Sequence, residues 1–336
     1  MASLHILPLV RLVCFSRQAG LLAARQVNHL PRAMSPFRLH GLVAAPFTPL
    51  HADGSLNLAL IPALAEGLVS NGIQGAFVLG TTGEGLSLTD EERRAVAEQW
   101  VRAAAGRLSV LVHVGHLSVR AAAGLAAHAQ AIGADAIGTC GPFFYPIREV
   151  RQIAAYCAEV AAAAPNIPFY YYHIPQMTHL SVSMVEFLEE AVPLVPSLRG
   201  IKYTHNDLEE YARLVEYDDG RFDIVFGRDE ILLQGLAAGA AGAIGSTFNF
   251  AGAHFQTLLD AWNNGDVVSA RSVQARGADL VRCLRRHGGL AAMKATMEHT
   301  GLDCGPVRAP LRSLDVSARA ALGRDLAAWG LAPVTA

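Results

Sequence analysis

The sequence lacks both the cysteine content of a disulfide-stapled protein and the charge of a nucleic-acid binder. Its 336 residues include five cysteines, an odd number, and no two of them form a CxxC pair. This usage is typical of a reduced, intracellular protein rather than a disulfide scaffold. The net charge is −2 at pH 7, so there is no basic field to hold a polyphosphate. The composition therefore argues against a nucleic-acid partner.

Long uninterrupted apolar segments are also missing. Residues 231–255 contain no Asp, Glu, Lys or Arg, but five glycines and several polar residues interrupt them. A membrane-spanning helix needs about 20 mostly apolar residues. We expect a helix, a buried strand and a loop in this stretch, and no membrane span. Hydrophobic residues make up 52% of the chain, which excludes native disorder and allows a large core.

Acidic residues are absent from the N-terminal part, where the first one is Asp53. The first forty residues hold five arginines and no lysine. Arg-rich starts without acids are typical of mitochondrial transit peptides. Alternatively, Met34 is the true start and residues 1–33 are translated upstream sequence. Both interpretations make residues 1–36 an N-terminal extension. The predicted location is the cytoplasm, or the mitochondrion if residues 1–33 are a targeting segment.

From residue 41 onward, short apolar runs alternate with longer segments rich in Ala, Leu, Glu and Arg. Continuous apolar runs suit strands that are buried on both faces, as in parallel sheets. The predicted strands are 41–47, 75–80, 108–114, 135–140, 167–172, 199–203, 223–227 and 242–246.

Eight strand–helix units in strict alternation predict an α/β protein, a (β/α)8 TIM barrel over residues 37–262. Thr89 and Glu92 form a capping box that predicts a helix start. A doubly wound sheet is the main alternative, but the first strand leads into Pro46 instead of a glycine-rich phosphate turn. Helices predicted at 267–286, 290–300 and 315–329 make up a C-terminal helical extension over residues 263–336.

A lysine stands at the end of the sixth predicted strand, where a barrel places its chemistry. Lys202 follows Gly200 and Ile201 inside an apolar run. Burial disfavours the ammonium form and lowers a lysine pKa. The neutral amine attacks carbonyl carbons to form an imine, whose cation withdraws electrons from the neighbouring carbon. A lysine that reaches solvent from a strand end gives the same pattern.

Other strand ends supply further candidates. Tyr172 ends the fifth strand, beside the sixth, and a phenol near an amine can relay protons. Thr81 and Thr82, in the glycine-rich loop 80–85, offer hydroxyls and amides that suit a carboxylate. The alternatives are a packing tyrosine and an ordinary βα turn.

Two acids follow the seventh strand. Asp229 and Glu230 either recognise sugar hydroxyls or complement a helix dipole. His113 and His116 lie three apart, but the sequence holds no HExxH motif and no Cys/His ligand set, so we predict no metal.

Five motifs, in order at consecutive strand ends, resemble the dihydrodipicolinate synthase / N-acetylneuraminate lyase family of class I aldolases. They are GTTGEG (80–85), YYYHIP (170–175), GIKYT (200–204), FGRDE (226–230) and GAIGSTFN (242–249). The resemblance runs from about residue 38 to 312, and the animal-type lyases are the most similar branch.

This resemblance implies a mechanism and a site. Lys202 would form a Schiff base with the 2-oxo carbon of the substrate, and Tyr172 would shuttle the proton of its 4-hydroxyl. The implied reaction splits N-acetylneuraminate, a sialic acid, into N-acetylmannosamine and pyruvate, reversibly and without a cofactor. Family members are usually homotetramers. The implied binding residues are Thr81 and Thr82 for the carboxylate, and Thr204, Gly227, Asp229, Glu230 and Ser246 for a polyol tail.

The chain departs from the family pattern at three places. Phe144 stands where many bacterial members have a tyrosine that reaches a neighbouring subunit, and Tyr145 is one residue off. Residues 176–178 follow Pro175 without the arginine that holds a second carboxylate in synthases, which argues against dihydrodipicolinate synthesis. His173 replaces an asparagine common in bacterial forms.

Two alternatives stay open at the level of sequence. One is another pyruvate-dependent aldolase, such as one acting on 4-hydroxy-2-oxoglutarate or a sugar acid. Asp229 and Glu230 would repel a dianion, which favours a neutral polyol tail. The other alternative is a non-catalytic barrel that binds a ligand or partner. Intact Lys202, Tyr172 and Thr82 count against it.

Overall fold

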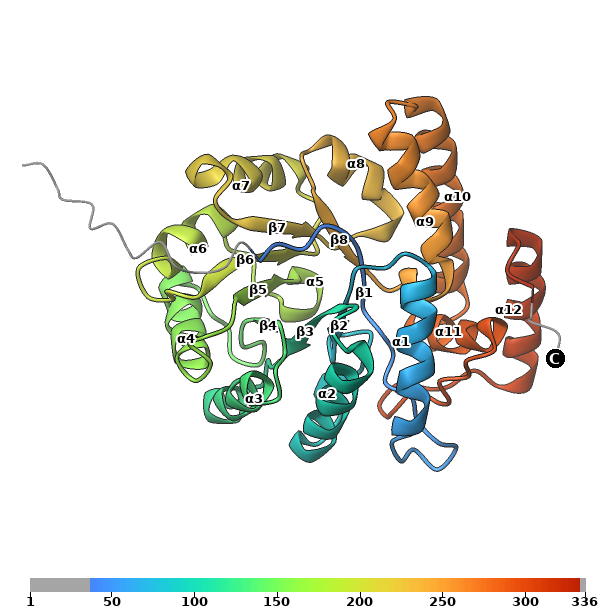
Figure 1. Cartoon of the computed structure of the whole chain (residues 1–336), viewed down its shortest axis with the longest axis horizontal. Coiled ribbons are helices and arrows are strands. Elements are labelled where there is room, and N and C mark those ends of the chain that lie inside the picture. Colours follow the sequence, from blue (N-terminus) through green and yellow to red (C-terminus); the bar gives the residue numbers. More distant parts are fainter. Residues whose placement is uncertain (1–36, 333–336) are drawn as a thin grey trace, which may run out of the picture. The chain divides into compact units, whose positions relative to one another are not determined.

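Eight parallel strands close into a barrel in the computed structural model, which describes residues 37–332 (Figure 1). Each strand pairs with the next along the chain, and β8 pairs with β1 to close the sheet. The TIM barrel predicted from the apolar runs is confirmed. The predicted N-terminal extension lies outside the described residues. The strands are β1 (Gly41–Ala44), β2 (Gly75–Val78), β3 (Ser109–His113), β4 (Ala136–Thr139), β5 (Phe169–His173), β6 (Leu198–Tyr203), β7 (Asp223–Phe226) and β8 (Gly242–Gly245).

Several strands are shorter than the apolar runs that predicted them. The run 41–47 forms a strand only over Gly41–Ala44, although the residues that follow it stay buried. β7 ends at Phe226, one residue earlier than predicted, and Asp229 and Glu230 begin the 3-10 helix η3 (Asp229–Ile231).

Helices surround the barrel (Figure 1). The predicted capping box is confirmed, because the Thr89 hydroxyl accepts from the Glu92 amide while the Glu92 carboxylate accepts from the Thr89 amide. The helices are α1 (Ile61–Ser70), α2 (Asp90–Ala104), α3 (Val119–Ala131), α4 (Val150–Ala162), α5 (Pro175–Thr178), α6 (Met184–Ala191), α7 (Leu208–Gly220), α8 (Leu232–Ala237) and α9 (Phe248–Asn263), with 3-10 helices η1 (Leu58–Leu60) and η2 (Gly85–Ser87).

Three further helices follow the barrel, as predicted. They are α10 (Val267–Arg286), α11 (Leu290–Ala295) and α12 (Val316–Trp329); the helix expected over 290–300 divides into α11 and the 3-10 helix η4 (Thr296–Thr300). α10 packs along α9 and also contacts α12 (Figure 1). Within residues 37–332, no helix combines the length and apolar character that a membrane span requires.

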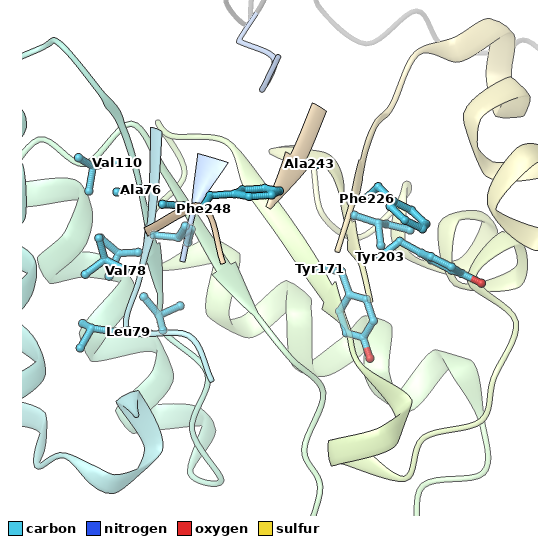
Figure 2. Packing of buried hydrophobic residues seen from close by; sticks show 14 of the residues in the cluster. Ala76, Val78, Leu79, Val110, Tyr171, Tyr203, Phe226, Ala243 and Phe248 are labelled. Atoms are coloured by element: carbon cyan, nitrogen blue, oxygen red, sulfur yellow. The ribbon is translucent and has the colours of Figure 1, made fainter. Parts of the chain in front are cut away.

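Buried side chains form two layers, one inside the barrel and one between the strands and the helices. Figure 2 shows part of the outer layer, with Val78, Tyr171 and Phe226 among the labelled side chains. Successive side chains of a strand point to opposite faces. Tyr171 therefore lies in the outer layer, while Tyr170 and Tyr172 lie inside the barrel. This alternation is what brings Tyr172 into the barrel.

Candidate active site

A cavity of about 720 Å³ is lined by residues that follow the strands at their carboxyl ends. Its size suits a small organic molecule. Helices α10 and α11 also contribute to its lining, through Val281, Leu290 and Met293. Sequence reasoning missed this contribution. All the predicted site residues line the cavity: Lys202, Tyr172, Thr81, Thr82, Thr204, Gly227, Asp229, Glu230 and Ser246.

Lys202 is buried at the end of β6, with 4% of its surface exposed. Its Nζ lies 4.0 Å from the centroid of the Phe77 ring and 4.1 Å from that of Tyr172. Burial lowers the pKa of Lys202 to about 7, and the negative charge of Asp229 opposes the shift. About half of the amine is then neutral at pH 7. The lysine is therefore sheltered from solvent and nucleophilic at neutral pH.

Tyr172 stands beside Lys202 because the two residues are register partners on neighbouring strands. The Tyr172 hydroxyl lies 3.4 Å from the hydroxyl oxygen of Thr81. Burial raises the pKa of Tyr172 to about 12, and the Thr81 hydrogen bond partly offsets this. The phenol thus holds its proton at neutral pH and can donate it to a group that forms at the lysine.

The loop after β2 brings threonine hydroxyls to the same cavity. The Thr82 hydroxyl lies 2.6 Å from that of Ser246, which follows β8. The loop turns so tightly that a Cβ at Gly85 would lie 1.9 Å from the carbonyl oxygen of Leu79. A glycine is required there, and the turn holds the threonines beside Tyr172 and Ser246.

Asp229 is a buried carboxylate at the start of η3. Its Oδ2 accepts from the amide and the hydroxyl of Thr247, at 2.9 and 2.7 Å. Burial raises the pKa of Asp229 to about 6, against the effect of the Thr247 hydrogen bonds. A Cβ at Gly245 would lie 2.3 Å from the other carboxylate oxygen, so that glycine makes room for the acid.

Glu230 lies in a cluster of arginines. Its Oε1 accepts from Nη2 of Arg228 at 2.6 Å, and also from Arg285 of α10. Burial works against ionisation, but the Arg228 hydrogen bond and both positive charges lower the pKa of Glu230. The prediction that Asp229 and Glu230 repel a dianion did not include these two arginines, which offset the negative charge of Glu230.

Gly227 and Thr204 form a close contact between the ends of β7 and β6. A Cβ at Gly227 would lie 2.0 Å from the Thr204 hydroxyl oxygen, so only glycine fits. The backbone at Gly227 can therefore form the cavity lining.

Comparison with known proteins identifies the family of this barrel. Residues 38–329 match the model of the Dihydrodipicolinate synthetase family. The chain belongs to this family. N-acetylneuraminate lyase of Mus musculus is 41% identical over 280 residues, which cover 82% of this chain and 88% of that protein. N-acetylneuraminate lyase A of Xenopus laevis is 42% identical over 281 residues, covering 82% and 92%. The structure of the Proteus mirabilis N-acetylneuraminate lyase has a TM-score of 0.86 and 39% identity, covering 88% of this chain and all of that one.

Two departures of this chain from the dihydrodipicolinate synthetase family pattern, at Phe144 and at residues 176–178, can be compared with the cavity lining. The cavity lining includes Phe143 but neither Phe144 nor Tyr145. Residues 176–178 line the cavity without supplying an arginine, whereas the arginines that do line it, Arg228 and Arg285, both bind Glu230. Gln176, Met177 and Thr178, which directly follow Pro175, therefore supply no cation for a second carboxylate.

His113 is a cavity residue whose contribution the sequence did not reveal. Its ring packs edge to face on Tyr172, with the centroids 5.9 Å apart. Neither ring nitrogen has a hydrogen-bond partner within residues 37–332. Burial, assisted by the positive charge of Arg93, lowers the pKa of His113 to about 3. A neutral imidazole therefore forms part of the wall near the lysine. Its position at the end of β3 was the only signal in the sequence.

A buried ion pair connects the loop 80–85, which carries Thr81 and Thr82, to α11. Glu84 Oε1 lies 2.7 Å from Nζ of Lys294 in α11, and Glu84 Oε2 accepts from the Arg308 amide at 2.6 Å. Sequence reasoning missed this pair because 210 residues separate its partners. The pair fixes the loop that carries Thr81 and Thr82 to the helices that follow the barrel.

Proposed function

We propose that this protein is an N-acetylneuraminate lyase, which cleaves N-acetylneuraminate to N-acetylmannosamine and pyruvate through a Schiff base. The observation that carries the proposal is the buried amine of Lys202, with its pKa lowered to about 7 beside Tyr172. Relatives of about 40% identity that bear this name support the choice of substrate.

Schiff-base formation follows from the two protonation states. The neutral amine of Lys202 attacks the 2-oxo carbon to give a carbinolamine. Tyr172 donates its proton to the departing hydroxyl, which leaves as water. The products are an iminium cation at Lys202 and a phenolate at Tyr172, and their opposite charges stabilise each other in the desolvated site.

Cleavage uses the same two groups. The phenolate accepts the proton of the 4-hydroxyl while the C3–C4 bond breaks. The electron pair of that bond moves toward the iminium nitrogen, so an aldehyde leaves and an enamine remains. Protonation of the enamine at C3 and addition of water release pyruvate and restore the amine. The reaction is redox-neutral and balances without a cofactor.

Substrate contacts are assigned by chemistry and position. Thr81 and Thr82 bind the carboxylate next to the reacting carbon, because their loop lies beside Tyr172. The polyol tail meets Thr204, the Gly227 backbone, Asp229 and Ser246. Glu230 contributes through its carboxylate, whose Oε1 is already held by Arg228 and Arg285.

Other pyruvate aldolases are less well supported. A dihydrodipicolinate synthase needs a group for a second carboxylate, and residues 176–178 offer no arginine. A 4-hydroxy-2-oxoglutarate or sugar-acid aldolase is distinguished by its substrate alone. A non-catalytic barrel would have no use for a desolvated lysine, whose burial is unfavourable.

We further propose a homotetramer in the cytoplasm. The loops after β2 and β4 expose the large apolar side chains of Leu86, Phe144 and Tyr145, of which the last two are 71% and 74% exposed. Exposed apolar groups of this size favour a covering partner, here another copy of the chain. Light scattering of the purified protein measures the mass, and cell fractionation measures the location.

The substrate is tested by assaying pyruvate release from a panel of 2-oxo acids. We expect the highest kcat/KM for N-acetylneuraminate. A higher value for 4-hydroxy-2-oxoglutarate or a shorter sugar acid would replace the proposed substrate but keep the Schiff base. If no 2-oxo acid is turned over, the result would contradict the proposed function and support the alternative of a non-catalytic barrel.

A further inference from the structure

A second group of chemically active side chains lies at the ends of β5 and β6, the strands that carry Tyr172 and Lys202, and on α7. His173 ends β5, His205 follows β6 and Glu210 is in the first turn of α7. One potential ligand atom from each lies within 4.8 Å of the others. None of the three lines the cavity. Since Tyr172 lies inside the barrel, the alternation of β5 turns His173 to the outer side.

His173 has an unsatisfied nitrogen. The residue is 3% exposed, and its Nε2 has no hydrogen-bond partner within residues 37–332. Buried polar atoms are rarely left unpaired, and an ion or a water usually explains one that is.

Glu210 is held in position by two hydrogen bonds. Its Oε1 accepts from the Met184 amide and its Oε2 from the Tyr203 hydroxyl, both at 2.8 Å. Metal-binding carboxylates are commonly oriented by such outer hydrogen bonds, which still leave a lone pair for an ion. His205 is only partly buried, and its Nδ1 lies 3.4 Å from the same Tyr203 hydroxyl.

In a second group of similar composition, two of the potential ligands are hydrogen-bonded directly to each other. Cys283, His287 and Asp325 also bring ligand atoms together, between α10 and α12. There the Asp325 carboxylate accepts from His287 at 2.8 Å and from Arg286 at 3.1 Å. An arginine beside the carboxylate disfavours a cation. This group serves as the comparison in the experiment below.

We propose that His173, His205 and Glu210 form a binding site for Zn²⁺. Two imidazoles and one carboxylate are a ligand set that Zn²⁺ takes in proteins, with water in the fourth position. The ion would join α7 to the ends of β5 and β6, the strands that carry Tyr172 and Lys202. The prediction of no metal from sequence relied on short motifs. These ligands come from three separate elements and form no such motif.

The test uses the full chain, treated with EDTA and dialysed, and titrated with Zn²⁺ by calorimetry and with Co²⁺ by absorption spectroscopy. We expect one ion per chain and a Co²⁺ spectrum without a thiolate charge-transfer band, because the ligands are nitrogen and oxygen. His205→Asn and Glu210→Gln should weaken binding at least ~10-fold. His287→Asn is the matched control and should leave binding unchanged.

Two results would overturn the site. One is the absence of stoichiometric binding of either ion. The other is binding that persists in His205→Asn, disappears in His287→Asn and shows a thiolate band, which would assign the ion to Cys283. Because His205 is partly exposed, His205→Asn is expected to fold even if Glu210→Gln does not. A rise in Tm with Zn²⁺ in the parent chain and not in His205→Asn provides a second measure.

Discussion

Lys202 and Lys294 are the only two lysines in the sequence, and both are buried. Their surroundings differ. Lys294 pairs with Glu84 at 2.7 Å, whereas the Lys202 amine lies over the rings of Phe77 and Tyr172. Burying a charge without a partner is expensive, so Lys202 gives up its proton more readily. One lysine is thus a structural cation and the other a candidate nucleophile.

The pH profile of kcat/KM follows from the lowered pKa of Lys202, about 7. Only the neutral amine attacks, so kcat/KM should rise about tenfold per pH unit below 7 and level off above it. In Asp229→Asn, the pH at which kcat/KM levels off should be lower, because the variant lacks the carboxylate charge that stabilises the ammonium form of Lys202. If kcat/KM of the parent enzyme levels off only near the ordinary lysine pKa, the proposal that burial lowers the pKa of Lys202 would be contradicted.

Tyr172→Phe tests the proton transfer that both chemical steps require. The variant keeps the ring beside Lys202 but loses the proton that the phenol transfers. We expect kcat for cleavage to fall about 10²–10⁴-fold, the usual contribution of a general acid–base group. Stopped-flow measurement of pyruvate release checks this. Unchanged cleavage would remove Tyr172 from the proton transfer and leave it a packing residue.

Individual residues were predictable where a strand end places them. Lys202 and Tyr172 followed from the strand-end rule and from the pairing of adjacent strands. The ion pairing of Glu230 could not be predicted in this way, because Arg285 is 55 residues away in the sequence and lies in α10. His113 lies near the end of the predicted strand 108–114, but the lack of a hydrogen-bond partner for its ring depends on which side chains surround it.

At the scale of elements, the Glu84–Lys294 pair ties the loop after β2 to α11. Lys294→Met should destabilise the protein by about 3–5 kcal/mol, because it leaves a buried carboxylate without its cation. Urea unfolding measures the change. The control is Arg107→Met, which removes an exposed ion pair with Glu66 and should cost less than about 1 kcal/mol. Equal losses in the two variants would contradict the structural role of the buried pair.

The order and kind of the elements were predictable, but some of their ends were not. Apolar runs mark buried backbone whether or not it pairs as a strand, which is why 41–47 overestimated β1. The helices after the barrel were expected, but not that they line the cavity. Periodicity predicts which residues of a helix are buried and not which element covers them.

At the scale of the whole molecule, the N-terminal extension is open to a direct test. Among the described residues, Arg199 donates to the Phe37 carbonyl, and the Leu39 amide donates to Asp223 at 2.8 Å. A chain that starts at Met34 should keep the kcat/KM and Tm of the full chain. A chain that starts at His40 loses both contacts and should have a lower Tm. A loss of activity on removing residues 1–33 would contradict this division of the chain.

The covalent bond at Lys202 is tested most directly by borohydride reduction in the presence of pyruvate, followed by peptide mass spectrometry. With only two lysines in the chain, the assignment is unambiguous. We expect a reduced pyruvyl adduct on Lys202, none on Lys294, and none in Lys202→Arg, whose guanidinium stays protonated. Lys202→Arg should also lose at least ~10⁴-fold in turnover. An unmodified Lys202, or full turnover in Lys202→Arg, would contradict the account.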